Sequence, residues 1–296
     1  MRSKEFLYIL LGFYLLAFPA TAFGSENNEV INEKTGDSIV VYGESLSDSQ
    51  KEQVKEDLEV VEGDQELTVT GQDVQNYING NPTARLFSSA KIIPLEKGEG
   101  LTITIVNEEY ITEVTTEMYA NALLTAGVEN AEVIIASPVK VTGHSALTGI
   151  YKAYDVKGEK LDQERMEVAN EELSLLTTLA EDAGLDKEQV SRLFTNIKKE
   201  IAEQNPVSKE EVEQIVSEQL KNLNIELSEE NRQLLIDLFE KIRSLDIDFE
   251  QIKSQLNDLT QKIEDILGDE GFWRSLLQGI QNFLQSITNF IKSIFG

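Results

Sequence analysis

A turn at residues 141–145, with the sequence Val-Thr-Gly-His-Ser, brings together side chains that could do chemistry. Ser145 falls where a predicted strand leads into a predicted helix, which is how α/β-hydrolases present their nucleophile. The hydrolase pattern is Gly-x-Ser-x-Gly, however, and here its last position is Leu147. His144 is the only histidine, and beside a serine that caps a helix it would point elsewhere. We therefore interpret Ser145 as a helix N-cap and His144 as a turn residue.

The same turn could bind an anion. Backbone N–H groups at the start of a helix point toward a negatively charged group, and the helix dipole favours it. Phosphates or carboxylates of cell-envelope polymers have the required charge. The predicted ligand-binding residues are Thr142, Gly143, Ser145 and Thr148. Any capped helix offers this geometry, so the pattern alone does not distinguish this helix from others.

Composition removes most metal and cofactor chemistry. The chain has no cysteine and one histidine, which excludes most zinc sites, haem ligation and Cys-His nucleophiles. We predict no cofactor, no resident metal and no catalytic residue, although carboxylate chemistry and oxygen-ligated cations remain possible. Glu108 and Glu109 could in principle serve a glycosidase, but such pairs arise by chance among 53 acidic residues.

The charge balance limits the class of partner. The formal net charge is -27, from 53 acidic and 26 basic residues. Nucleic acid is excluded, because phosphate binding requires clustered lysines and arginines. Polyanionic envelope polymers are disfavoured less strongly, since a local basic patch could still hold them. The length of 296 residues allows one or two domains, each with its own core.

Residues 1–22 have the features of a secretory signal peptide. A short basic start precedes an almost unbroken apolar stretch at 6–18, and Ala20-Thr21-Ala22 supplies small residues for cleavage. The apolar stretch is too short for a resident membrane-spanning helix. We predict a protein that is secreted or held on the outer face of the cell envelope, beginning with a flexible leader at 23–36.

Short strand and helix patterns alternate over residues 37–158. They predict an α+β domain with a small mixed or antiparallel sheet and packed helices. Residues 101–105 alternate strictly between apolar residues and threonine. Residues 133–136 are apolar on both faces, which predicts a central strand. A threonine at 115–116 caps a helix that ends at Gly127.

No strand pattern follows, so the second half is predicted to be an extended all-α region. We divide it into a helical extension at 159–205 and a helical hairpin with a long heptad helix at 206–268. Capping boxes beginning at Asp186 and Ser208 start two of these helices. Asn205-Pro206 separates them.

The longest periodic pattern predicts one continuous helix over about 229–267. Its ten apolar residues recur at spacings of three and four: Leu235, Leu238, Ile242, Leu245, Phe249, Ile252, Leu256, Leu259, Ile263 and Ile266. Such a seam requires a facing helix. We favour a helix of the same chain, and a homodimeric coiled coil is the alternative.

Residues 269–296 are predicted to form an amphipathic C-terminal helix. From Gly271 onward there is no acidic residue and only two basic ones. The face predicted to meet a membrane or a partner comprises Phe272, Trp273, Leu276, Ile280, Phe283, Ile287, Phe290 and Ile294. Packing on the rest of the protein is favoured, a membrane-surface position is second, and a protein partner is third.

Four local patterns characterise residues 37–200. They are YG at 42–43 with LS at 46–47, SS at 88–89 with KGEGL at 97–101, MYANA at 118–122 with TAG at 125–127, and Pro138 with VTG at 141–143, SALTGI at 145–150 and KAY at 152–154. With them the segment resembles the YpuA-like family, secreted proteins of unknown function from Gram-positive bacteria. The resemblance implies an exported, envelope-associated protein and supplies no catalytic residues. The long helix and tail resemble the family only in general character.

We therefore expect a non-enzymatic binding or scaffold module of the cell envelope. Its partner would be a cell-wall polymer or an envelope protein, with peripheral membrane contact through the C-terminal helix. The alternative is an extracellular glycan hydrolase that uses carboxylates. The absence of cysteine, the single histidine and the lack of a catalytic motif favour the binding module.

Overall fold

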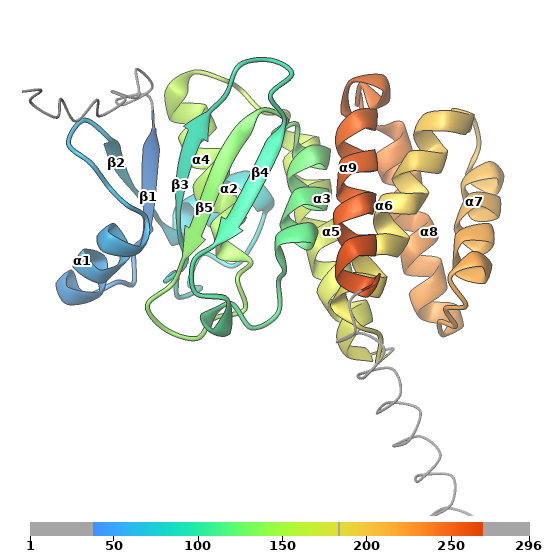
Figure 1. The fold of residues 1–296 in the computed structure, drawn as a ribbon, viewed down its shortest axis with the longest axis horizontal. Helices are drawn as coiled ribbons and strands as arrows, with labels where there is room; N and C mark the ends of the chain where they lie inside the picture. Colours follow the sequence, from blue (N-terminus) through green and yellow to red (C-terminus); the bar gives the residue numbers. More distant parts are fainter. Residues whose placement is uncertain (1–37, 183, 269–296) are drawn as a thin grey trace, which may run out of the picture. The chain divides into compact units, whose positions relative to one another are not determined.

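The computed structural model describes residues 38–182 and 184–268 (Figure 1). The predicted signal peptide, leader and C-terminal helix lie outside the described residues. The strands are β1 (Ile39–Gly43), β2 (Gln65–Val69), β3 (Ser89–Pro94), β4 (Leu101–Ile105) and β5 (Ala131–Ala136). The helices are α1 (Asp48–Asp57), α2 (Gly71–Ile78), the 3₁₀ helix η1 (Glu108–Tyr110), α3 (Thr116–Ala126), α4 (Ser145–Lys157), α5 (Gln163–Asp182), α6 (Lys187–Gln204), α7 (Lys209–Asn222), α8 (Glu229–Ser244) and α9 (Phe249–Gly268).

The strands form a mixed sheet with the order β2-β1-β3-β5-β4. β1 pairs in parallel with β2 and antiparallel with β3. β5 pairs antiparallel with β3 and in parallel with β4. The prediction of an α+β fold with a small mixed sheet and a helical C-terminal part is confirmed. β5 contains the apolar segment 133–136 and lies inside the sheet, as that segment predicted.

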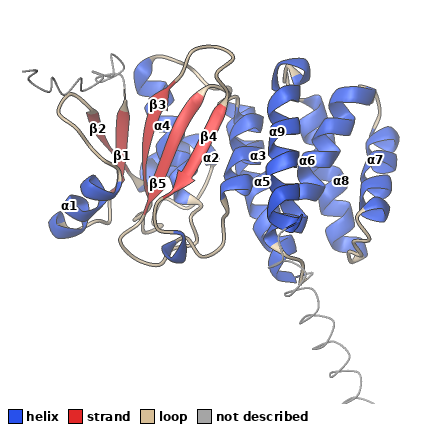
Figure 2. Cartoon of the chain, viewed as in Figure 1, coloured by secondary structure: helices blue, strands red, loops and turns tan. Residues whose placement is uncertain are grey.

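Different helices cover the two faces of the sheet (Figure 2). Ile39 and Val41 of β1 belong to the large core, which α3 and α4 complete. Val40 and Tyr42 belong to a smaller cluster with Val54 of α1. This division follows from the strand geometry, because successive side chains of a strand point to opposite faces.

Several predicted helix ends are found where the sequence placed them. The Thr115 side chain caps α3, and Gly127 ends that helix in the left-handed conformation. Asp186 begins α6 with a capping box. The Ser208 side chain caps α7. In each case a local hydrogen bond or a backbone preference fixes the boundary, so short sequence signals are sufficient.

The prediction of one continuous helix over 229–267 is wrong. The segment forms two helices, α8 and α9, because Leu245 adopts an extended conformation with φ −69° and ψ 152°. Asp248 then accepts a hydrogen bond of 3.1 Å from a backbone N–H in the first turn of α9, as an N-cap does. Leu245 and Ile247 are both buried. The turn therefore keeps the apolar spacing of the heptad pattern while it interrupts the helix.

Most of the apolar seam of α8 and α9 is covered within the chain, although Ile266 is 44% exposed. α8 packs against α5 and α7, and α9 packs against α6 and α3. One cluster of buried apolar residues extends from Ile39 in β1 to Leu256 in α9. Among the described residues, no helix has the length and apolar character needed to cross a membrane.

Candidate functional site

A cavity of about 390 Å³ opens where the chain enters α4. All four predicted ligand-binding residues line it: Thr142, Gly143, Ser145 and Thr148. The rest of its wall comes from α2, the segment before β3 and the residues beside the turn: Val74, Ile78, Ala84, Arg85, Leu86, Phe87, Lys140, Val141 and His144. The structure thus places the predicted residues around one cavity and adds a wall that is distant in sequence.

The turn into α4 is centred on Gly143, where only glycine fits. Gly143 has φ +109°, and a Cβ there would lie 2.7 Å from both Ile111 Cγ2 and the Tyr119 hydroxyl. The Tyr119 hydroxyl donates a hydrogen bond of 2.6 Å to the carbonyl oxygen of Gly143. Val141 forms a parallel bridge with Ile111. Contacts from α3 and from the neighbouring extended segment therefore fix the backbone of the turn.

The prediction that Ser145 caps α4 is wrong. His144 occupies the cap position with helical angles, φ −54° and ψ −35°, and no side chain caps the first turn. The N–H groups of Ala146 and Leu147 donate to the carbonyls of Gly143 and His144, as in a 3₁₀ turn. Because this tighter turn starts one residue early, Ser145 lies inside the helix. No hydrogen bond to a described residue uses the N–H of His144 or Ser145, so both can meet a ligand.

Two cations and a buried hydroxyl give the cavity its chemical character. Arg85 and Lys140 line the cavity, and neither forms an ion pair with another described residue. Thr148 is fully buried, and its hydroxyl has no hydrogen-bond partner in the described part of the chain. A buried hydroxyl without a partner costs stability. Unpaired cations beside such a hydroxyl can hold an anionic group.

His144 contacts groups other than Ser145. Its Nε2 lies 3.3 Å from the Thr177 hydroxyl, and its Nδ1 lies 4.0 Å from the Glu113 carboxylate. Burial lowers the pKa of His144, and the negative charge of Glu181 opposes this shift. No hydrogen bond between described residues joins His144 to Ser145, so the contact that a serine nucleophile needs is missing. The described residues also contain no cluster of three or more His, Cys, Asp or Glu side chains that could hold a metal ion.

The carboxylate pair considered for a hydrolase lies elsewhere. Glu108 and Glu109 are exposed in η1 and do not line the cavity. Arg85 and Lys140 were not predicted from the sequence, because they are far apart in the chain and belong to no recognised motif. Lys140 stands only two residues before Thr142, and this neighbouring charge was the one available local signal.

Comparison with known proteins connects this geometry with a family. A family model described as "Protein of unknown function (DUF1002)" matches residues 42–259, which include every residue that lines the cavity. The chain belongs to the DUF1002 family. A relative from Bacillus subtilis (strain 168), "Uncharacterized protein YpuA", is 35% identical over 268 residues, covering 88% of this chain and 90% of the relative. The resemblance to the YpuA-like family is thereby confirmed. No solved structure matches.

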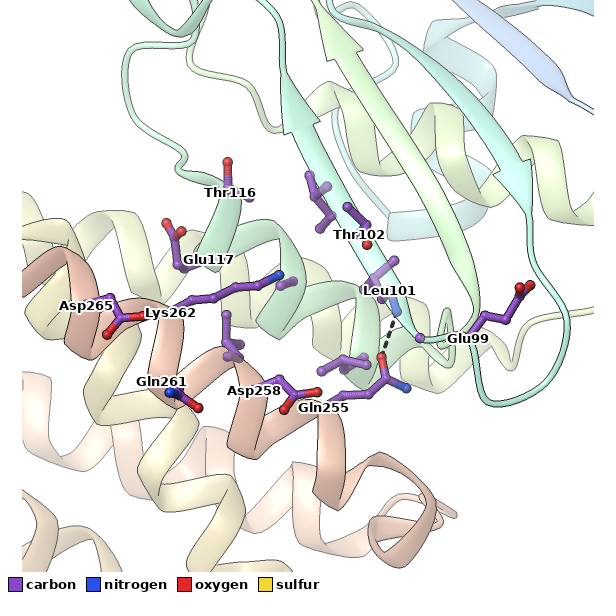
Figure 3. Close-up of a pocket in the computed structure, with 15 residues that line it drawn as sticks. Glu99, Leu101, Thr102, Thr116, Glu117, Gln255, Asp258, Gln261, Lys262 and Asp265 are labelled. Carbon is purple, nitrogen blue, oxygen red and sulfur yellow. Dashed lines mark hydrogen bonds between the residues drawn. The ribbon is translucent and has the colours of Figure 1, made fainter. Parts of the chain in front are cut away.

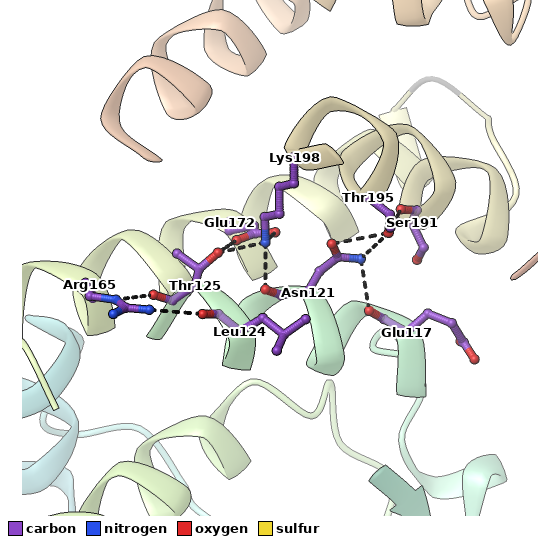
Figure 4. Close-up of polar contacts among 9 residues, drawn as sticks. All are labelled: Glu117, Asn121, Leu124, Thr125, Arg165, Glu172, Ser191, Thr195 and Lys198. Carbon is purple, nitrogen blue, oxygen red and sulfur yellow. Dashed lines mark hydrogen bonds and ion pairs between the residues drawn. The ribbon is translucent and has the colours of Figure 1, made fainter. Parts of the chain in front are cut away.

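A second polar cluster of the DUF1002 chain lies inside the helical core (Figure 4). Lys198 of α6 and Glu172 of α5 form an ion pair of 2.6 Å, and both side chains are at most 1% exposed. The Lys198 ammonium also donates to the carbonyl of Asn121 and the hydroxyl of Thr125, each at 2.7 Å. Two hydrogen bonds and one ion pair thus surround the ammonium group, and the contact with Glu172 Oε1 lacks hydrogen-bond geometry. Burial lowers the pKa of Lys198, and the Glu172 carboxylate opposes this shift.

Arg165 extends this cluster to the end of α3. It donates to the carbonyl oxygens of Thr125 and Leu124 at 2.8 and 3.2 Å (Figure 4). These carbonyls belong to the last turn of the helix, where a positive charge stabilises the negative end of the dipole. In this DUF1002 protein the cluster cross-links α3, α5 and α6, which is a structural role.

Proposed function

We propose that this protein is an exported, non-catalytic binding module of the cell envelope whose cavity at the start of α4 binds an anionic group. The ligand class is a polymer that carries phosphate or carboxylate groups. One observation carries the proposal: Thr148, whose buried hydroxyl has no partner among the described residues, lines the same cavity as the unpaired cations Arg85 and Lys140. The signal-peptide pattern of residues 1–22 supports export.

The charges close to the cavity, more than the net charge of the whole protein, determine whether an anion can bind there. The formal net charge of -27 repels a polyanion at long range. At physiological ionic strength this repulsion is screened beyond about 8 Å. Within that distance, the two cations and the N–H groups at the start of α4 provide a positive local potential. A short anionic group can therefore bind the cavity although the whole molecule is negative.

Two features of the site support binding over turnover. The His144 ring contacts Thr177 and lies near Glu113, and no hydrogen bond between described residues joins it to Ser145. The exposed pair Glu108 and Glu109 lies outside the cavity. A hydrolase would need a base or a carboxylate pair at the site where the substrate binds.

The test is cosedimentation of the mature protein with purified Gram-positive cell wall, with inorganic phosphate as competitor. Replacing Arg85 and Lys140 with glutamine should reduce the bound fraction at least about fivefold, because charged hydrogen bonds are lost. The matched control replaces Lys97 and Lys221 with glutamine; these exposed lysines do not line the cavity, and the change in net charge is equal. Equal binding by the two variants would contradict the proposal.

A turnover assay on the same cell wall tests the alternative enzyme. We expect no release of soluble sugar above the level of wall incubated without protein. Turnover that a single Asp or Glu substitution abolishes would support the carboxylate-dependent hydrolase and overturn the binding module.

We also propose that the C-terminal segment 269–296 (the tail) contacts a lipid surface through the face that contains Phe272, Trp273 and Phe283. The packing of most of the α8 and α9 seam against other described helices favours this arrangement, because it leaves little of the seam for the C-terminal residues to cover. Deleting residues 271–296 should abolish sedimentation with anionic lipid vesicles while the melting temperature stays unchanged. A lowered melting temperature with unchanged sedimentation would show that the tail packs on the rest of the protein. That packing is the arrangement favoured from the sequence alone.

A further inference from the structure

β4 is an edge strand, and no described strand pairs with its outer side. Within residues 38–182 and 184–268, β5 is the strand that pairs with β4. The carbonyl of Gly100 and the N–H of Val106 form hydrogen bonds to β5. Backbone groups alternate in direction along a strand, so those of Leu101, Ile103 and Ile105 point away from β5. An edge of this kind can pair with another chain.

A groove of about 400 Å³ follows this outer side, between β4, α3 and α9 (Figure 3). At one end, the N–H of Leu101 donates a hydrogen bond of 2.9 Å to Gln255 Oε1 of α9. Ile103 is the next residue with outward backbone groups, and it also lines the groove. No side chain of a described residue caps the N–H or carbonyl of Ile103 in the way that Gln255 caps Leu101. Strand addition could therefore begin at Ile103.

The walls of the groove are negatively charged. They contain Glu99, Glu117, Asp258 and Asp265 against Lys262, four acidic residues minus one basic residue, which leaves three negative charges. Glu117 is only 9% exposed, and its carboxylate has no hydrogen bond or ion pair with a described residue. Figure 3 shows Lys262 reaching from α9 across the groove. A lysine side chain thus already lies along the path that a basic ligand would use.

We propose that this groove binds an extended, basic peptide segment of another protein, which adds a strand to β4. The peptide backbone would pair with Ile103 and Ile105, and its cationic side chains would meet Glu117, Asp258 and Asp265. Backbone pairing supplies affinity, and the acidic walls select the charge of the partner. This surface and this ligand are distinct from the anion cavity at α4, so the two proposals can fail separately.

The first experiment measures fluorescence anisotropy of a labelled peptide with alternating lysine and valine, about six residues long to match a typical strand. The mature full-length protein is titrated against it. A control peptide has the same side chains but carries N-methyl groups on alternate residues, so that one edge cannot donate hydrogen bonds. N-methylation should weaken binding at least about tenfold, because several backbone hydrogen bonds are lost. Equal affinity of the two peptides, or no binding of either, would overturn strand addition.

The second experiment locates the binding site with charge variants of exposed residues. Replacing Asp258 and Asp265 with asparagine should lower affinity by about fivefold, because two exposed charges near the ligand are lost. Glu218 and Glu226 are exposed and do not line the groove, so replacing both with glutamine is the control of equal charge change. Lys262→Ala should raise affinity, since it removes a competing cation. If the groove variant and the control bind equally, the proposed site is wrong.

Discussion

The buried cluster between α3, α5 and α6 and the cavity at the start of α4 both combine cations with threonine hydroxyls, but their polar groups differ in partners. In the cluster, the Thr125 hydroxyl accepts from Lys198 and donates a hydrogen bond of 2.6 Å to Glu172. In the cavity, the hydroxyl of Thr148 has no partner among the described residues, and Arg85 forms no ion pair there. The paired charges of the cluster hold helices together, whereas the unpaired cations of the cavity remain available to a ligand.

Removing Lys198 should give the largest effect on stability. Lys198→Met leaves the Glu172 carboxylate buried without its counter-charge, so the free energy of unfolding should fall by about 3–5 kcal/mol. Urea denaturation measures this loss.

The double variant Lys198→Met with Glu172→Leu is the control. It removes both charges and should recover much of the stability, because no buried charge remains. If the single variant lost less than about 1 kcal/mol, the paired cluster would not have the structural role that the comparison assigns to it.

The two threonines provide a matched pair of substitutions. Thr125→Val should lower the free energy of unfolding by about 1–3 kcal/mol, because Lys198 and Glu172 each lose a partner. Thr148→Val should raise it by up to about 1 kcal/mol, because it removes an unpartnered buried hydroxyl, while affinity for phosphate falls. Thermal unfolding and isothermal titration measure these two quantities. Destabilisation by both substitutions, with unchanged phosphate binding, would remove the distinction between the two sites.

The pH dependence of stability tests whether His144, which lines the cavity, is buried in its neutral form. Burial holds the pKa of His144 below its ordinary value of about 6.5. The unfolded chain therefore takes up this proton at a higher pH than the folded chain. The stabilisation from neutral His144 is lost as pH falls below about 6.5 and restored as pH rises.

His144→Gln should remove this component, so its free energy of unfolding should fall less steeply than that of the natural chain between pH 7 and pH 5. The difference between the two chains is the informative quantity, because Glu113, whose pKa is raised by burial, titrates in both. Parallel curves would show that His144 stays accessible to protons in the fold.

The smallest expected effect on stability belongs to the cavity cations. Replacing Arg85 and Lys140 with glutamine should change the free energy of unfolding by less than about 0.5 kcal/mol, because neither residue has an ion pair in the described part of the chain. Chemical denaturation of the variant already used for cell-wall binding measures this. A loss of unfolding free energy as large as that of Lys198→Met would show that these cations stabilise the fold.

Local signals predicted much of the fold, because helix ends depend on residues near in sequence. Asp186 and Gln189 marked the start of α6 through a reciprocal capping box. Asp248 and Gln251 have the same spacing at the start of α9. The heptad pattern alone gives no indication of this second start, because Leu245 and the first residues of α9 preserve its spacing across the break.

The candidate site was predictable only in part for a related reason. Thr142, Gly143, Ser145 and Thr148 lie within seven positions, so one turn and one helix bring them together. Arg85 reaches the same cavity through the packing of the segment before β3, and no sequence spacing encodes that approach. The cap was misassigned because the helical conformation of His144 depends on contacts around Gly143, including those with α3.

The hydrogen bond between Leu101 and Gln255 joins residues 154 positions apart in the sequence. In a chain that is exported with its N-terminus first, the sheet can form before α9 is available. Until then, the Leu101 end of β4 lacks the hydrogen bond to Gln255, and a neighbouring unfolded chain can begin to pair there. Products cut short before α9 keep that state permanently. A chain that stops before α9 therefore leaves the N–H of Leu101 open to pairing, whereas a chain that includes α9 occupies this group with Gln255.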